Sequence, residues 1–317
     1  MDLFKIFTEI EKIDGEVYER FDTRRRAFKH MAGLGKAVTV ATMPALLSTM
    51  FNKAYGQTTT ALTPDMKAVL NLALQLEYLE FHYYDLGLKA NVIPASDVEG
   101  IKIIRDDEAG HISALQTVLG TDAIPDPGAE AFDYTGGGKL GGDPFASAAL
   151  YYGTSQAFVD TGVRAYKGGA PKLMANKDVL TAALNIHSVE ARHSSHIRMM
   201  RRVLANSTNG GDIGGGIGNM NPKSWVSLKE YDGPKPDLTA PVYGLGATLD
   251  FPAENNVTQG GVNIQTTTAY PTSLMLNDIQ KQAAATESFD EPLDADTVKA
   301  IARNFRSPLG VTKGLFM

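Results

Sequence analysis

The chain has 317 residues, of which 43% are hydrophobic and 21% charged, and its formal net charge is −6. This composition excludes a wholly disordered protein and a coiled coil. The acidic balance argues against a nucleic-acid partner, because such proteins neutralise phosphates with lysine and arginine. There is no cysteine, which excludes disulfide scaffolds, thiol catalysis and cysteine-ligated metals. Any metal must therefore be held by carboxylates and imidazoles.

Residues 1–56 have the pattern of an export leader. Residues 23–29 read Thr-Arg-Arg-Arg-Ala-Phe-Lys, and residues 37–51 carry no charge. That stretch is short for a membrane span, which needs about 20 residues, but it suits the apolar part of a signal peptide. Ala54 and Gly56 supply the small residues of a cleavage site. The pair Arg25 and Arg26, with Phe28 two residues on, resembles a twin-arginine signal. We expect a periplasmic protein without a membrane segment in its mature form. The alternative is an N-terminal helix followed by a buried apolar helix.

Residues 57–206 are predicted to form a helical domain, because apolar residues recur there with helical spacing. A Thr-Pro-Asp sequence marks the start of a first helix at Pro64, and Asp97 caps a second helix that runs to about Leu119. Residues 120–143 contain two prolines and a run of three glycines. We expect a long crossover loop there.

Two more helices follow the crossover. The third is expected to begin near Pro144 and to end at the Gly-Gly-Ala-Pro sequence that starts at Gly168, and the fourth to span about 178–206. Four arginines on the fourth helix are expected to form a surface face: Arg192, Arg198, Arg201 and Arg202. Four helices with two short connections and one long one predict an antiparallel bundle with a crossover.

Residues 207–317 form an extension of different character. Up to residue 292 they are rich in glycine, proline and threonine, with little helical period and no regular strand pattern. Because this stretch contains several aromatic residues, we expect it to pack around the bundle. A last short helix is expected to start at Asp294 or Asp296 and to turn three apolar side chains toward the core: Val298, Ile301 and Phe305. The fold class is therefore mainly α.

The candidate site is a motif that occurs twice. Glu108 and His111 form one Glu-x-x-His sequence, and Glu190 and His193 form another. The two side chains of each motif lie on one helix face, one turn apart. Each motif is preceded on the previous helix, 31 or 30 residues earlier, by a carboxylate in apolar surroundings: Glu77 and Asp160 respectively.

This repeated pattern predicts two metal ions inside the bundle. Four buried carboxylates without cations would be strongly unfavourable, because burial and mutual repulsion both oppose their ionisation. Ferritin-like di-iron and di-manganese bundles arrange their ligands in this way, and oxygen-rich ligation without thiolate favours iron or manganese. We predict two iron or manganese ions held by six residues: Glu77, Glu108, His111, Asp160, Glu190 and His193.

Some assignments stay open at this point. Glu80 lies one helical turn after Glu77 and is the alternative ligand on the first helix. The side chain of Asp160 is shorter than that of glutamate, which limits its reach. His187 and His196 share a helical stripe with the second motif, and we expect them beside the metals or on backbone carbonyls. Either motif alone is common by chance on helix surfaces, so the metal site depends on their repetition.

Four segments resemble the helix signatures of a known family: LNLALQLEYLEFHYY, DDEAGHISAL, AFVDTGVRAY and HSVEARHSSHIR. The chain is similar, over roughly residues 63–204 and in two tail segments, to the bacterial ferritin-like domain proteins grouped with desiccation-related proteins. The resemblance implies that Glu77 is the terminal glutamate and Glu108 a bridging one. It also implies that Tyr84 is the tyrosine that ferritin-type sites place beside the metals. The leader and the long tail would obstruct a 24-subunit cage, which argues against iron storage.

Three functional hypotheses follow. The first is an exported dinuclear oxidoreductase that reacts with O₂ or H₂O₂ in stress protection, with Tyr84 supplying an electron or a hydrogen bond. The second is a non-enzymatic stress or structural protein that uses the bundle as a scaffold, with metal bound for stability or absent. The third is a partner-binding module in which residues 207–292 are the working part. A homodimer is compatible with all three.

Overall fold

The structure of the protein is a computed structural model. It describes residues 61–207, 222–246, 248, 250–266 and 275–317, which belong to one compact unit, Leu47–Met317. The predicted export leader and the glycine-rich run at 210–218 lie outside the described residues. Within the described parts of the chain, no helix is both long and apolar enough to cross a membrane.

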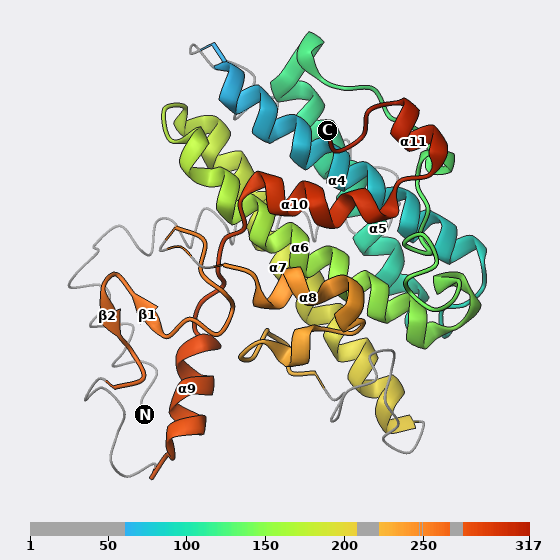
Figure 1. Ribbon diagram of the computed structural model, residues 1–317. Coiled ribbons are helices and arrows are strands. Elements are labelled where there is room, and N and C mark those ends of the chain that lie inside the picture. The colour runs from blue at the N-terminus through green and yellow to red at the C-terminus, as the bar shows by residue number, and fades with distance from the viewer. Residues whose placement is uncertain (1–60, 208–221, 247, 249, 267–274) are drawn as a thin grey trace, which may run out of the picture. The chain divides into compact units, whose positions relative to one another are not determined.

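Four long helices make up the centre of the fold (Figure 1): α4 (Pro64–Lys89), α5 (Val98–Leu119), α6 (Ala148–Leu173) and α7 (Lys177–Ser207). Helix α4 packs along α5, α6 packs along α7, and α4 and α6 contact each other between these two pairs. Short connections join the members of each pair, whereas residues 120–147 carry the chain from the first pair to the second. The predicted four-helix bundle with a long crossover is confirmed.

Local capping signals account for most helix starts. Thr63 caps α4 by accepting a hydrogen bond from a backbone N–H of its first turn. Helix α6 starts later than predicted, because Ser147 caps it, and Pro144–Ala146 forms a separate 3₁₀ turn. Asp97 precedes α5 as predicted, but its side chain makes no capping bond. The Asp97 carboxylate instead accepts a hydrogen bond of 2.6 Å from the hydroxyl of Tyr152.

The predicted end of the third helix at Gly168 is wrong. Helix α6 continues through Gly168 and Gly169 to Leu173. A Cβ atom on Gly168 would lie 1.8 Å from the carbonyl oxygen of Leu293, and one on Gly169 would lie 2.7 Å from the side chain of Val69. The two glycines are therefore required by the close approach of other segments and do not terminate the helix.

The C-terminal extension is more helical than its composition indicates. It contains α8 (Pro236–Gly244), α9 (Asp278–Thr286), α10 (Ala295–Ala302) and α11 (Pro308–Thr312), and strands β1 (Thr258–Gln259) and β2 (Val262–Asn263) pair antiparallel. Short 3₁₀ turns occupy Gly120–Asp122, Ala129–Ala131, Glu230–Asp232 and Arg303–Phe305. Helices of five to nine residues make at most about two and a half turns. Such short helices leave little periodicity for sequence analysis to detect.

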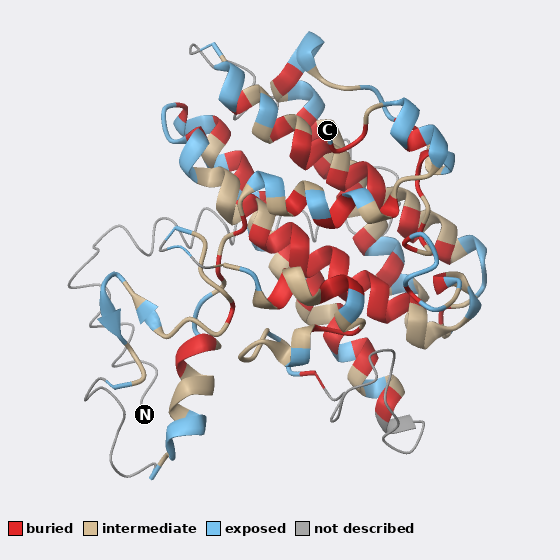
Figure 2. Ribbon diagram, viewed as in Figure 1, coloured by how far each residue is buried: buried red, intermediate tan, exposed pale blue. Residues whose placement is uncertain are grey.

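Helix α10 crosses the bundle and contacts both α4 and α6 (Figure 1). Asp294 caps it, with its carboxylate accepting a hydrogen bond of 2.8 Å from the backbone of Thr297. Val298, Ile301 and Phe305 are buried, as predicted. Figure 2 shows buried residues on α10 and along the bundle helices. The extension therefore packs on the bundle at this helix and extends its hydrophobic core.

Candidate metal centre

Six ionisable side chains meet in the apolar interior of the bundle. Each of these residues is at most 5% exposed: Glu77, Glu80, Glu108, His111, Glu190 and His193. Helices α4, α5 and α7 supply two each, three residues apart. This spacing places each pair on one helix face, so three helices direct their polar pairs to the same place.

His111 lies between three carboxylates. Its Nδ1 atom is 3.1 Å from one oxygen of each of Glu77, Glu108 and Glu190. One ligand atom from each of these four residues can be chosen so that all lie within 4.8 Å of one another. An ion bound 2.0–2.2 Å from each donor atom holds its ligand atoms roughly 3 to 4.4 Å apart. The four residues are therefore close to the spacing that a single ion requires.

His193 repeats this arrangement on the other side of the cluster. Its Nδ1 atom is 3.1 Å from Glu108 Oε1 and 3.6 Å from Glu190 Oε2. Its Nε2 atom is 3.1 Å from Oδ2 of Asp107, a residue that sequence analysis did not identify. A histidine that binds metal through one nitrogen commonly bonds a carboxylate through the other, which fixes the ring. Glu108 and Glu190 lie between the two histidines, where carboxylates that bridge two ions would be needed.

Several buried atoms of the cluster have no hydrogen-bond partner among the described residues: Glu80 Oε2, Glu108 Oε1, both carboxylate oxygens of Glu190, and His193 Nδ1. Some of these atoms are close together, as His193 Nδ1 and Glu108 Oε1 are, but they lack the alignment of a hydrogen bond. A buried polar atom without a partner is costly. Lone pairs that converge without bonding one another fit shared cations, so the residues present are suited to metal.

The charges of the cluster lead to the same conclusion. Burial raises the pKa of Glu77 to about 8, against the opposing effect of His111. Burial, reinforced by the charges of Glu190 and Glu108, holds the pKa of Glu80 well above its usual range. Burial alone would lower the pKa of His111, but Glu77 and the other carboxylates raise it well above its usual range. Without metal the cluster therefore holds protons, which divalent ions would replace.

Asp160, the predicted ligand on the third helix, does not join the cluster. Its Oδ1 atom accepts a hydrogen bond of 2.7 Å from Ser194. Its Oδ2 atom accepts one of 2.7 Å from the hydroxyl of Tyr243 and another from the guanidinium of Arg198, with which it forms a buried ion pair. Both carboxylate oxygens thus accept hydrogen bonds from residues outside the cluster. One of these residues, Tyr243, belongs to the C-terminal extension.

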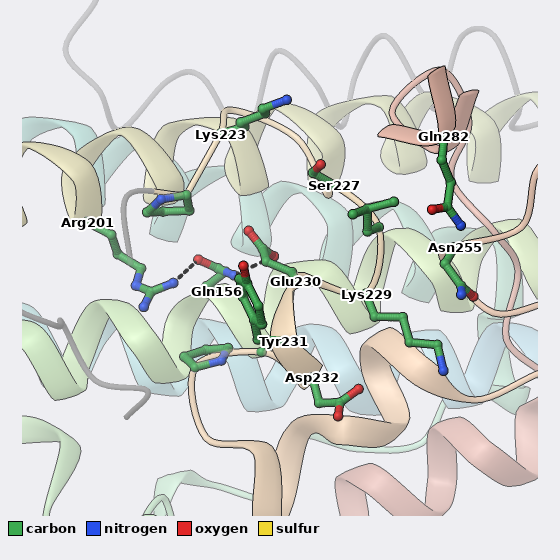
Figure 3. Close-up of a pocket in the computed structure, with 14 residues that line it drawn as sticks. Gln156, Arg201, Lys223, Ser227, Lys229, Glu230, Tyr231, Asp232, Asn255 and Gln282 are labelled. Atoms are coloured by element: carbon green, nitrogen blue, oxygen red, sulfur yellow. Dashed lines mark hydrogen bonds between the residues drawn. The ribbon is translucent and has the colours of Figure 1, made fainter. Parts of the chain in front are cut away.

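Arg198 and Arg201 are buried, so the prediction that they form part of a surface face is wrong. Arg198 bonds both Asp160 and Glu230 of the extension. Glu230 accepts a hydrogen bond of 3.2 Å from Gln156, and Gln156 accepts one from Arg201 (Figure 3). The extension covers this part of α7, and the buried guanidinium groups bond its residues and those of α6. A pocket of about 540 Å³ lies beside this network, and Gln156, Arg201 and Glu230 are among its lining residues.

Glu80 stands where a third-helix ligand was predicted. Gly162 of α6, two positions after Asp160, lies against the cluster. A Cβ atom on Gly162 would lie 3.4 Å from Glu80 Oε1 and 3.5 Å from Glu190 Oε2. The absence of a side chain at Gly162 leaves this space to Glu80, which reaches it from α4. Glu77 and Glu80 are both buried beside the other carboxylates, but of the two only Glu77 belongs to the four residues whose ligand atoms lie within 4.8 Å of one another.

A family model described as the ferritin-like domain matches residues 65–202. The matched segment contains nearly all of α4 and α7 and the whole of α5 and α6. The similarity to the ferritin-like domain therefore covers the four-helix bundle and stops before the extension. Searches of curated proteins and of solved structures returned no match. The buried glutamate and histidine cluster inside this ferritin-like domain is able to hold metal.

Two tyrosines of the ferritin-like domain lie close to the cluster. Tyr84 is buried, and its hydroxyl is 2.9 Å from Ser155 Oγ, so it bonds α6 and not a carboxylate. Burial, followed by the charges of Glu80 and Glu108, raises the pKa of Tyr84 well above its usual range. Tyr166, which sequence analysis missed, donates its hydroxyl to Glu77 Oε1. Tyr166 lies one turn after Gly162 on α6, so the two residues share a helix face.

The remaining histidines of the ferritin-like domain lie outside the cluster. His187 Nδ1 is 3.0 Å from the backbone carbonyl of Val163, the arrangement expected for this residue. His82 Nε2 is 2.8 Å from Asp126. His196 lies against Gly100, where a Cβ atom would be 2.3 Å from its Nε2. Among the described residues, the candidate metal centre thus uses two imidazoles, His111 and His193.

Proposed function

We propose that the ferritin-like domain holds two iron or manganese ions and that the protein is an oxidoreductase acting on O₂ or H₂O₂. The observation that supports this most directly is the set of converging, buried carboxylate and imidazole atoms without hydrogen-bond partners among the described residues. Glu77 and His111 would hold one ion and Glu80 and His193 the other. Glu108 and Glu190, which lie between the histidines, would bridge them.

Bound iron or manganese would supply the electrons that O₂ or peroxide accepts. The residues around the ions have separate tasks. Tyr166 holds one oxygen of Glu77 by a hydrogen bond and is placed to pass a proton to it. Asp107 orients the ring of His193. The apolar interior of the bundle excludes water, which strengthens every charge interaction within the site.

We also propose that the protein is exported and acts in stress protection in the periplasm. The arginine pair and the apolar stretch at residues 37–51 support export, and the resemblance to desiccation-related proteins supports the role. A twin-arginine route carries folded proteins, so metal would be bound before export. Replacing Arg25 and Arg26 together by lysine should retain the protein in the cytoplasm. The control Lys36→Arg should leave export unchanged, and export of the double variant would contradict the proposal.

Metal analysis by plasma mass spectrometry tests the centre itself. The protein isolated after export should contain about two iron or manganese ions per chain. Glu108→Ala and Glu190→Ala should lose them, while Glu99→Ala, on the exposed side of α5, should keep them. Peroxide consumption by the loaded protein is the assay that follows. Stoichiometric metal without turnover would favour a non-enzymatic stress protein, and absence of metal from a folded protein would reject the metal centre.

A further inference from the structure

A second internal space lies beside the metal centre. It is a cavity of about 210 Å³ between α4, α6, α7 and α10, and its walls are mainly aliphatic and aromatic, including Ala73, Leu76, Ala183 and Val298. Among the described residues that line it, only Lys172 and Asp294 carry a charge. The Lys172 side chain is largely exposed and pairs with Asp65 at 3.1 Å, so its charge lies at the outer end of the cavity.

The cavity reaches the cluster at Tyr166. Tyr166 lines it, and the hydroxyl of the same residue bonds Glu77 Oε1. Leu70, Ala73 and Leu76 also line it, and they precede Glu77 on α4 by seven, four and one residues. A molecule held in the cavity would therefore be separated from a proposed metal ligand by a single phenol ring.

The cavity is built jointly by the ferritin-like domain and the extension. Phe251, Leu293 and Val298 form part of its wall, and all three lie beyond the matched residues 65–202. On the bundle side the lining includes residues with little or no side chain, among them Ala73 and Ala183. Protein interiors are close-packed, and an empty apolar space is unfavourable because its lining loses contacts. The small residues at these positions leave the space open where larger side chains would fill it.

We propose that this cavity binds a compact apolar molecule, about the size of benzene or slightly larger, next to the metal centre. Apolar cavities of about 150 Å³ stay dry and take up benzene or xenon. The walls of this cavity offer little hydrogen bonding, because the hydroxyl of Tyr166 is already used by Glu77. The binding site stands without metal, whereas its position next to bound metal ions rests on the proposed function.

Fluorobenzene binding to the metal-free full chain, followed by ¹⁹F NMR, tests the site. We expect saturable binding with a Kd on the order of 0.1–1 mM, and no binding of benzoate. Ala183→Leu and Ala73→Leu fill the cavity and should each weaken binding at least tenfold. Ala182→Leu adds the same volume at a neighbouring buried position outside the lining and should leave the Kd unchanged. Thermal melts establish that each variant is folded.

Absence of saturable binding to the folded wild-type chain overturns the proposal. Wild-type affinity in both Ala73→Leu and Ala183→Leu overturns it as well. A second measurement tests the position beside the metals. Mn²⁺ bound at the cluster should strongly increase the ¹⁹F relaxation rate of bound fluorobenzene. Glu108→Ala should abolish that increase but still bind fluorobenzene. Bound Mn²⁺ without relaxation enhancement would place the ligand elsewhere, whereas fluorobenzene binding in a chain that takes no metal would reject only the metal centre.

Discussion

The two helix pairs of the bundle carry the same sequence pattern but use it differently. In the pair α4–α5, Glu77 joins Glu108 and His111 in one cluster. In the pair α6–α7, the corresponding Asp160 bonds Arg198 and Tyr243 outside the cluster, and Gly162, which has no side chain, lies against the cluster instead. In the proposed centre, the first pair would supply Glu77 and Glu80 as terminal ligands, and the second would supply Glu190 and His193.

This difference arises because Asp160 of the second pair bonds residues that hold the C-terminal extension on the bundle. Arg198 is buried, and a buried guanidinium requires carboxylate partners, because an uncompensated charge in the interior is strongly unfavourable. Asp160 and Glu230 meet that requirement, and Glu230 belongs to the extension. The second helix pair therefore serves two purposes, since one stripe of it faces the cluster and another holds the extension on the bundle.

The largest expected effect comes from Asp160→Asn. If Asp160 pairs with Arg198, its neutralisation should destabilise the protein by about 3 kcal/mol, because one charge of a buried pair is removed. The bound metal should remain at its wild-type level, since Asp160 lies outside the cluster. Denaturant unfolding and metal analysis of the same preparation provide the test. Loss of one ion with unchanged stability would instead make Asp160 a ligand and the two helix pairs equivalent.

Glu80→Gln examines the other side of the comparison. If Glu80 replaces a third-helix ligand, this substitution should weaken the binding of one of the two ions about 100-fold or more, because it removes a charged donor. One ion per chain should then remain after dialysis. Glu77→Gln should weaken the binding of the other ion to a similar degree. Titration with Mn²⁺ followed by electron paramagnetic resonance measures both constants. Two tightly bound ions in Glu80→Gln would contradict the proposed ligand set.

The pH dependence of the metal-free protein should also follow the first helix pair. The pKa of Glu77 is about 8 in the fold against 4.5 for a free glutamate. The folded state therefore binds a proton between these values that the unfolded state has released. This contribution to stability is complete below about pH 4.5 and is lost as the pH rises through about 8. The chelated protein should thus lose about 1.4 kcal/mol per pH unit in this range, or on the order of 2 kcal/mol between pH 5 and 6.5.

Thermal melts with and without metal measure this loss. Stoichiometric Mn²⁺ should abolish most of it, because the metal replaces the proton. Glu77→Gln should reduce it as well, since the glutamine cannot titrate. A metal-free protein that is equally stable at both pH values would show that the cluster does not retain protons.

Asp107→Ala should have the smallest effect. Asp107 contacts the outer nitrogen of His193 and would orient it without touching a metal. Its removal should weaken metal binding at His193 about tenfold, the lower end of the range for such supporting groups. Metal binding at His111 should be unchanged. Asp106→Ala, at the adjacent position, is the matched control and should change neither constant. Equal losses at both ions would instead indicate a general effect on the fold.

Much of the bundle could be predicted from sequence because its signals are local. The Thr-Pro-Asp start of α4 acts within one turn of helix, as capping signals do. The two Glu-x-x-His motifs predict which side chains share a face, because three-residue spacing on a helix leaves little choice. The short helices of the extension and the passage of α6 through Gly168 depend on packing partners far away in the chain, so periodicity could not reveal them.

By itself, the sequence determined four bundle helices and two matched sets of three potential ligands, from which metal binding was predicted. Only the tertiary structure decided which residue of α6 faces the cluster, because that depends on the rotation of α6 against its neighbours. It also decided that Asp160 belongs to Arg198, that Glu80 occupies the space over Gly162, and that Tyr166 contacts Glu77. The residues in these three contacts are 38, 82 and 89 positions apart in the sequence. Helical periodicity relates side chains along one helix and contains no information about pairings between helices.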